Sequence, residues 1–164
     1  MGKSLLLLRH GKSDWREGEA DFDRGLAKRG RLAAVLMGQY LDENDLIPDA
    51  IVTSPAVRAL STAEIVQEEL DDIELIEDER IYEASIDSLL DVVNGLADEY
   101  ERVLLVGHNP GFEELADELS GRSDSVLKTC SLAILHCGSG SWSEVAPGGC
   151  KLQEIVHPAE VAEA

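Results

Sequence analysis

Aromatic residues are scarce in this chain, because tryptophan, tyrosine and phenylalanine together make up 4% of its 164 residues. The interior must therefore be built mainly from leucine, valine, isoleucine and alanine. Basic residues are also few, 14 against 33 aspartate and glutamate residues, which gives a formal net charge of −19. With no basic stripe to follow nucleic-acid phosphates, we expect no nucleic-acid partner. The acidic excess fits a saline habitat or a simple margin of solubility, and the sequence leaves both open.

Long hydrophobic runs are absent as well. No segment approaches the roughly 20 apolar residues that a membrane-spanning helix requires, and the four leucines that follow Ser4 are too few for a secretory signal. Only three cysteines occur, Cys130, Cys137 and Cys150, with no C-x-x-C pair. We interpret them as free thiols in a reducing compartment, in preference to a disulfide or a zinc site. The sequence therefore predicts a cytoplasmic protein without a membrane partner.

Apolar runs typical of buried strands alternate with amphipathic helices along most of the chain. We expect strands near residues 5–8, 50–53, 73–76, 102–106, 131–136 and 151–156, and helices near 26–41, 55–70, 86–97 and 110–119. This alternation predicts an α/β protein, a three-layer α/β/α fold with a mostly parallel central sheet of about six strands. The last two strands would form an antiparallel edge. Residues 1–158 would form a single domain and residues 159–164 a frayed tail.

Three of the expected strands lead into residues suited to bind an anion. The first ends at Arg9 and His10, the second is followed one helical turn later by Arg58, and the fourth is followed by His108. Ligands of open α/β sheets bind at the carboxyl ends of the strands, so we expect these side chains to meet at one edge. Gathering cations there is unfavourable without an anionic ligand, and arginine pairs well with phosphate or carboxylate.

Phosphoryl transfer suits these residue types. Arg9, Arg58 and His108 would place positive charge around the equatorial oxygens, and the imidazole of His10 would attack phosphorus in line. The helix that Pro55 opens would add its dipole to the same pocket. The set lacks the carboxylates that Mg²⁺ prefers, so we expect neither a metal nor another cofactor.

Four segments carry motifs that occur together in one known family. They read L-R-H-G-K-S-D-W at 8–15, D-R-G-L-A-K-R-G at 23–30, T-S-P-A-V-R-A-L-S-T-A at 53–63 and V-G-H-N-P-G at 106–111. In this order they resemble the histidine phosphatase superfamily, with its phosphoglycerate mutase-like fold, and above all its small branch of SixA-type phosphohistidine phosphatases. The motifs span most of the chain, and as a set they are highly specific.

The resemblance implies a role for each matching residue. His10 would be the nucleophile and would pass through a phosphohistidine intermediate, while Arg9, Arg58 and His108 would bind the phosphoryl group. Ser13 or Asn109 would add a further hydrogen bond to it.

Glu83 stands where many members of the family carry the carboxylic acid that protonates the leaving group. It would do so at neutral pH only if its surroundings raised its pKa. The alternative is that Glu83 is one exposed carboxylate among 33 acidic residues.

Larger relatives insert a sizeable segment over the pocket, whereas here the short stretch between the second and fourth strands already holds two helices and a strand. We therefore expect no large cap insertion, and an open site that admits a phosphorylated side chain of a protein. Lys12 stands where mutases typically carry glutamate, which argues against a mutase or a bisphosphatase. The leading interpretation is a phosphohistidine phosphatase for proteins. The alternatives are a phosphomonoesterase for a sugar or nucleotide phosphate, and a non-catalytic phospho-binding module.

Overall fold

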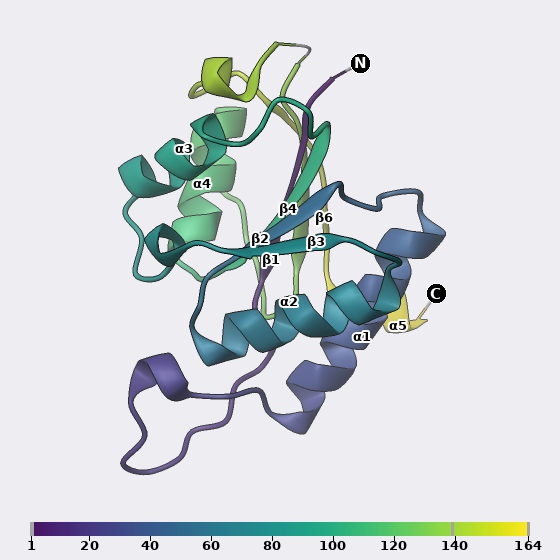
Figure 1. The fold of residues 1–164 in the computed structure, drawn as a ribbon, viewed down its shortest axis with the longest axis vertical. Coiled ribbons are helices and arrows are strands. Elements are labelled where there is room, and N and C mark those ends of the chain that lie inside the picture. The colour runs from purple at the N-terminus through teal and green to yellow at the C-terminus, as the bar shows by residue number, and fades with distance from the viewer. Residues whose placement is uncertain (1, 139, 164) are drawn as a thin grey trace.

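Figure 1 shows a computed structural model of the chain, which describes residues 2–138 and 140–163. The strands are β1 (Ser4–Arg9), β2 (Ala50–Thr53), β3 (Glu74–Glu77), β4 (Arg102–Gly107), β5 (Leu132–His136) and β6 (Lys151–Val156). The α-helices are α1 (Lys28–Glu43), α2 (Val57–Glu69), α3 (Ile86–Asn94), α4 (Gly111–Ser120) and α5 (Pro158–Glu163). Short 3₁₀ helices occur at Asp21–Asp23, Glu79–Ile81 and Trp142–Glu144. The strands and the four helices expected from the sequence are all present.

The strands form one six-stranded sheet in the order β3-β2-β4-β1-β5-β6. β3, β2, β4 and β1 run parallel, whereas β5 pairs antiparallel with β1 and β6 antiparallel with β5. Helices α1, α2 and α5 pack on one face of the sheet, and α3 and α4 on the other (Figure 1). The expected three-layer fold with an antiparallel edge is confirmed.

β1 shows why the leucine run becomes the centre of this sheet. Its four leucines are buried, each at most 1% exposed. Leu5 and Leu7 belong to the core beneath α3 and α4, while Leu6 and Leu8 belong to the core beneath α1 and α2. Successive side chains of a strand point to opposite faces, so a strand covered on both faces reads as a continuous apolar run.

The strand register aligns the carboxyl ends that matter for function. Arg9 at the end of β1 lies opposite Gly107 at the end of β4, and Thr53 at the end of β2 lies opposite Val106. The residues that follow β1, β2 and β4 therefore emerge at one edge of the sheet.

The C-terminal segment differs from the expected frayed tail. Residues 158–163 form helix α5, and Ala164 lies outside the described residues. The carboxylate of Glu160 accepts a hydrogen bond from the amide of His157 at 3.0 Å, and Val161 packs against the core on the α1 side. A cap and an apolar contact thus stabilise a helix too short to be recognised from periodicity.

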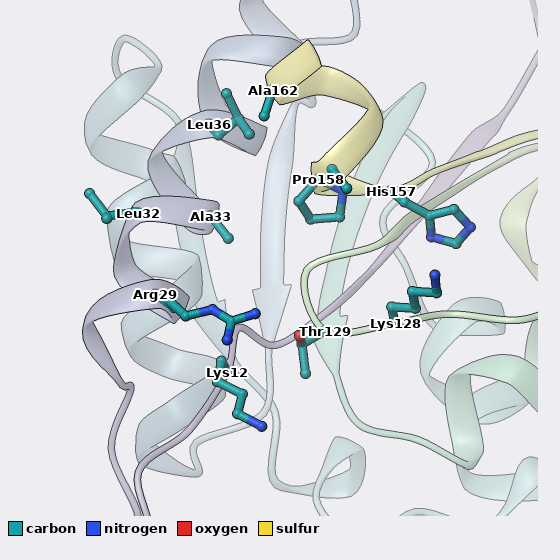
Figure 2. A pocket seen from close by; sticks show the side chains of 11 residues that line it. Lys12, Arg29, Leu32, Ala33, Leu36, Lys128, Thr129, His157, Pro158 and Ala162 are labelled. Carbon is teal, nitrogen blue, oxygen red and sulfur yellow. The ribbon is translucent and has the colours of Figure 1, made fainter.

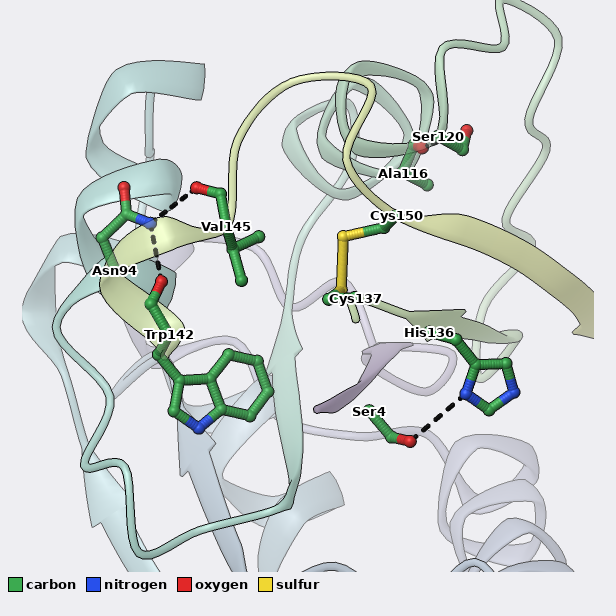
Figure 3. Close-up of a disulfide and its surroundings, with 9 residues drawn as sticks. All are labelled: Ser4, Asn94, Ala116, Ser120, His136, Cys137, Trp142, Val145 and Cys150. Atoms are coloured by element: carbon green, nitrogen blue, oxygen red, sulfur yellow. Dashed lines mark hydrogen bonds between the residues drawn. A yellow bond between two sulfur atoms is a disulfide. The ribbon is translucent and has the colours of Figure 1, made fainter. Parts of the chain in front are cut away.

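The expectation of three free thiols is wrong for two of them. Cys137 and Cys150 form a disulfide (Figure 3), and only Cys130 is free and buried. The antiparallel register pairs His136 with Lys151, so the cysteines that flank this pair face each other. The pairing depends on a register that the sequence does not reveal, and the thiol argument for a reducing compartment no longer applies. None of the helices within residues 2–138 and 140–163 has the length and apolarity needed to cross a membrane.

Candidate active site

His10 follows the last residue of β1 and is 7% exposed. Its Nδ1 lies 2.7 Å from the carbonyl oxygen of Gly11. A carbonyl oxygen only accepts, so Nδ1 carries the proton and Nε2 keeps its lone pair. The amide of Gly11 donates to Oγ1 of Thr62 at 3.0 Å, and that hydroxyl donates to the carbonyl oxygen of Arg58 at 2.7 Å. The imidazole is therefore held with one nitrogen free to act as a nucleophile.

Close glycine contacts hold the loop after His10 against helix α1. A Cβ added to Gly11 would lie 2.8 Å from the carbonyl oxygen of Gly30, and a Cβ on Gly30 would collide with the backbone of Lys12. Only glycine at both positions permits this approach. A larger residue at either one would displace the loop, and with it the imidazole.

His108 follows β4 and faces the same space. Its ring centroid lies 5.2 Å from that of His10, with an angle of 54° between the ring planes. Its Nε2 lies 2.8 Å from the hydroxyl of Ser54, which follows β2. Its Nδ1 is buried and has no hydrogen-bond partner among the described residues. The ends of β1, β2 and β4 thus meet through these side chains, as the strand order requires.

Two arginines bring positive charge to this edge of the sheet. Arg58, in the first turn of α2, is 6% exposed, and the Nη1 of Arg9 donates to the carbonyl oxygen of Leu127 at 3.0 Å. The Nε groups of both arginines are buried without partners among the described residues. Buried N–H groups without partners are unfavourable, and an anion bound between them would accept their hydrogen bonds.

The environment keeps both imidazoles neutral at pH 7. The pKa of His10 is lowered to about 4, mainly by burial; the hydrogen bond to Gly11 opposes this shift, and the charges of Arg58 and Arg9 contribute to it. Burial also lowers the pKa of His108 to about 3, with the charges of His10 and Arg58 acting in the same direction. The cationic character of the site at neutral pH therefore resides in the guanidinium groups, and His10 has an available lone pair.

Three residues at this site were not anticipated from the sequence: Asp21, Arg24 and Tyr82. Arg24 lies close enough that its charge lowers the pKa of both imidazoles. Its Nη1 lies 3.6 Å from the carboxylate of Asp21, and its guanidinium stacks 4.1 Å from the ring centroid of Trp15. Arg24 stands in the second motif of the resemblance, which could have identified it.

Asp21 links the loop before α1 to the arginine of α2. Arg58 donates from Nη1 to the Asp21 carbonyl oxygen at 2.8 Å and from Nη2 to its Oδ2 at 3.0 Å. The hydroxyl of Tyr82 donates to the same Oδ2 at 2.7 Å, and its ring stands edge-on to His108, 5.6 Å between centroids. The bonds from Tyr82 and Arg58 lower the pKa of Asp21, so this carboxylate is an anion bound to Arg58.

The remaining predicted residues lie at different distances from this centre. Glu83 is exposed and lines a cleft of about 260 Å³ together with His108 and Asn109. Asn109 donates from Nδ2 to the carbonyl oxygen of Leu127 at 2.8 Å, the same oxygen that binds Arg9, and its Oδ1 has no partner among the described residues. Ser13 instead forms an isolated β-bridge with Leu26, and its side chain makes no hydrogen bond to another site residue among the described residues. Within residues 2–138 and 140–163, no group of His, Cys, Asp and Glu is placed to hold a metal ion.

Comparison with known protein families shows to which family the chain belongs. The model of the histidine phosphatase superfamily (branch 1) matches residues 5–129, and the chain belongs to this superfamily. An uncharacterized chloroplastic protein of Arabidopsis thaliana is 31% identical over 173 residues, which cover 96% of this chain and 79% of that protein. An uncharacterized protein of Mycobacterium tuberculosis is 33% identical over 151 residues, which cover 86% of this chain and 93% of that protein.

Solved structures share the architecture. A SixA protein from Agrobacterium tumefaciens superposes with a TM-score of 0.83 at 27% identity, covering 96% of this chain and 99% of that one. The protein histidine phosphatase SixA complexed with tungstate gives the same TM-score and coverage at 20% identity. A mycobacterial glucosyl-3-phosphoglycerate phosphatase gives a TM-score of 0.71 at 19% identity, covering 93% and 98%. These findings confirm the phosphoglycerate mutase-like fold, and the family supports a phosphatase.

Proposed function

We propose that this chain is a phosphatase in which His10 is the nucleophile, and that it removes the phosphoryl group from phosphohistidine on another protein. The orientation of His10 carries the proposal. Its Nδ1–H is held by Gly11 at 2.7 Å, so the neutral Nε2 is the atom left to attack phosphorus. Arg9 and Arg58 supply the neighbouring cations, each with an unpartnered Nε in the described chain.

In the first step, the Nε2 lone pair of His10 forms a bond to phosphorus while the bond between phosphorus and the leaving imidazole nitrogen breaks. That nitrogen keeps the bonding electrons and takes a proton from the carboxyl group of Glu83. Arg9, Arg58 and His108 stabilise the charge on the equatorial oxygens, with Arg24 and Asn109 close by.

In the second step, a water molecule attacks the phosphorus on His10 and gives its proton to the Glu83 carboxylate. His10 leaves with its electron pair, and inorganic phosphate is released. The acid and the nucleophile thus return to their starting states, and the scheme needs no metal.

Two observations favour a protein as substrate. Glu83, which lines the cleft, is exposed, and the stretch between β2 and β4 holds only α2, β3, a 3₁₀ turn and α3, with no inserted cap. The SixA structure from Agrobacterium tumefaciens is similar along nearly the whole chain. The fold shared with a glucosyl-3-phosphoglycerate phosphatase favours the second candidate, a small phosphomonoester.

The two candidates are separated by kcat/KM for a phosphohistidine-bearing protein domain and for a panel of sugar and nucleotide phosphates. We expect the protein to be the better substrate, and activity to survive a chelator. His10→Ala should abolish turnover, whereas His136→Ala, an exposed histidine at the far end of β5, should retain it. A higher kcat/KM for a metabolite would assign the chain to small substrates. No turnover by the wild type, together with no difference between wild type and His10→Ala, would reject the enzyme altogether.

A further inference from the structure

A second hollow, of about 460 Å³, lies between the N-terminal half of α1 and helix α5 (Figure 2). We call it the α1–α5 groove. Leu32, Leu36 and Pro158 are among the apolar residues that line it. Leu32 is 61% exposed, although it is a large apolar side chain on a helix. The groove therefore presents apolar surface to solvent between two helices, the arrangement that accepts a third helix.

The rim of the groove is basic in a strongly acidic protein. Lys12, Arg29 and Lys128 line it, and none of the lining residues in the described chain is acidic, although the chain has 33 acidic and 14 basic residues. All three are exposed, and none makes an ion pair with a described residue. Arg29 and Lys128 lie on opposite sides of Thr129 (Figure 2). Their charge is free to meet an acidic partner.

Helix stability does not explain this positive charge. α1 begins with Lys28 and Arg29 and continues to Arg31, with no acidic residue in its first turn and no side-chain N-cap. The N-terminus of a helix is the positive end of its dipole, so cations there are unfavourable for the isolated helix. Carboxylates bound in the groove would neutralise the positive charge of these side chains and would interact favourably with the positive end of the helix dipole.

The groove also adjoins the catalytic residues along the chain. Lys12 follows His10 by two positions. Lys128 follows Leu127, whose carbonyl oxygen binds both Arg9 and Asn109. An occupant of the groove would therefore lie beside the segments that hold the phosphoryl site.

We propose that the α1–α5 groove docks an acidic amphipathic helix of the phosphorylated protein substrate, next to the phosphohistidine that enters the active site. The proposal rests on the proposed function. The apolar face of the helix covers Leu32, Leu36 and Pro158, and its flanking carboxylates pair with Arg29, Lys128 and Lys12. The basic rim and the apolar wall together give a surface that complements such a helix in charge and in apolar contact.

The test uses a synthetic peptide of about 20 residues, long enough for a helix of about 30 Å. It carries leucines on one face, glutamates beside them and a single histidine, and a matched peptide has lysine in place of glutamate. Binding of the unphosphorylated peptides to the full chain is measured by fluorescence anisotropy. Hydrolysis is measured with both peptides after phosphorylation of the histidine by phosphoramidate, and with 4-nitrophenyl phosphate.

We expect the acidic peptide to bind and the lysine peptide not to bind. Arg29→Glu with Lys128→Glu should weaken binding of the acidic peptide, and kcat/KM for its phosphorylated form, by about tenfold, since two exposed ion pairs are lost and repulsion is added. The kcat for 4-nitrophenyl phosphate, measured at saturating substrate, should not change. Arg122→Glu with Lys151→Glu, exposed residues outside the groove, alters the net charge equally and should behave as wild type. Leu32→Gln should weaken binding, and Ile47→Gln, also exposed, should not.

Equal binding of the two peptides, or equal losses in the two double variants, would overturn the docking proposal. If the wild type forms a dimer that dissociates in the Arg29→Glu, Lys128→Glu variant, and peptide binding does not change, the groove would instead be an interface between two copies of the chain. If the wild type hydrolyses 4-nitrophenyl phosphate but neither phosphopeptide, the phosphohistidine assignment fails. The anisotropy measurement still decides the groove in that case.

Discussion

The chemistry of the site depends on which nitrogen of His10 carries its proton. The carbonyl oxygen of Gly11 binds Nδ1 at 2.7 Å, and the hydroxyl of Thr62 anchors the amide of Gly11 at 3.0 Å. Rotating the ring would break the first of these bonds inside a buried site, which is unfavourable. Burial lowers the pKa of His10 to about 4, so the free nitrogen is unprotonated at pH 7. One side chain thus gains a fixed tautomer and a neutral charge from its surroundings.

If Glu83 is the acid, the activity lost when it is replaced should depend on the leaving group of the substrate. Glu83→Gln keeps the size of the side chain but removes its acidic proton, so poor leaving groups should lose more activity than good ones. The measurement is kcat/KM, which reports the steps up to release of the leaving group, for a series of aryl phosphates whose phenols differ in pKa, with Glu79→Gln, an exposed neighbour in the chain, as the control. An equal loss across the series would mean that Glu83 is not the acid.

The buried imidazoles also predict how stability depends on pH. Histidine in the unfolded chain titrates near about 6.5, whereas burial lowers the pKa of His108 to about 3 in the folded chain. Below pH 6.5 the unfolded state therefore binds more protons, and stability present above that pH is lost as the pH falls toward the folded pKa. Replacing the imidazole removes this coupling between protonation and stability. As the pH is lowered from 7 to 4, the free energy of unfolding of His108→Asn should therefore fall less than that of the wild type. The difference should reach up to about 3 kcal/mol.

Urea titrations of both proteins at several pH values measure this difference directly. His157→Asn, a half-buried histidine beyond the catalytic strands, serves as the control and should follow the wild type. Parallel curves for wild type and His108→Asn would contradict the buried, neutral state of His108.

At the scale of elements, the proposed role of Arg58 in binding the phosphoryl group would make the loop before α1 a competitor of the substrate. Both Nη groups of this arginine are bound by Asp21 in the 3₁₀ helix Asp21–Asp23. A phosphoryl group must share or displace this carboxylate. The strength of the bond between Asp21 and Arg58 would therefore affect the affinity of Arg58 for a phosphoryl group.

Asp21→Asn should make inorganic phosphate a tighter inhibitor, because the neutral amide is a weaker competitor for the guanidinium. We expect the inhibition constant to fall by about fivefold, since exchange of one partly exposed ion pair is worth about 1 kcal/mol. Steady-state inhibition by phosphate measures this change, with Asp23→Asn in the same 3₁₀ helix as the control. Weaker inhibition together with a lower kcat would show that Asp21 instead positions Arg58.

The elements also explain which features could be predicted from the sequence. Buried parallel strands are visible as apolar runs, and their carboxyl ends must meet, so Arg9, His10, Arg58 and His108 could be placed together. The loop that carries Asp21 has no periodicity, and its path across the sheet edge is set by contacts with α2 and Tyr82. The site therefore contains an anion bound to Arg58 that no sequence pattern indicates.

Two other features depended on tertiary contacts. The disulfide follows from the β5–β6 register, in which His136 lies opposite Lys151. Helix α5 has only six residues and is held by the cap from Glu160 and by packing of Val161. Neither a register nor a cap on so short a helix leaves a reliable trace in the sequence.

At the scale of the whole molecule, a net charge of −19 acts against the compact state. Added salt shortens the Debye length from about 10 Å at 0.1 M to about 3 Å at 1 M and screens this repulsion. Thermal melts should therefore show Tm rising by several degrees between low salt and molar NaCl. A Tm that does not change or falls with NaCl would contradict the importance of self-repulsion.

The negative charge of the whole protein also affects how an anionic substrate would approach the proposed phosphoryl site. Arg9, Arg58 and Lys12, which lines the α1–α5 groove, bring positive charge close to His10 in a chain whose net charge is −19. An anionic substrate is repelled by most of the surface and attracted to this region, so its approach is guided toward His10.

The central claim is that His10 carries the phosphoryl group during turnover. Rapid quenching of the reaction with radiolabelled substrate, followed by peptide mapping, tests it most directly. The account predicts transient label on the peptide that contains His10, in a bond that is stable to alkali and labile to acid, and no label in His10→Ala. Label on another residue, or full turnover with no labelled protein at any time, would contradict the account.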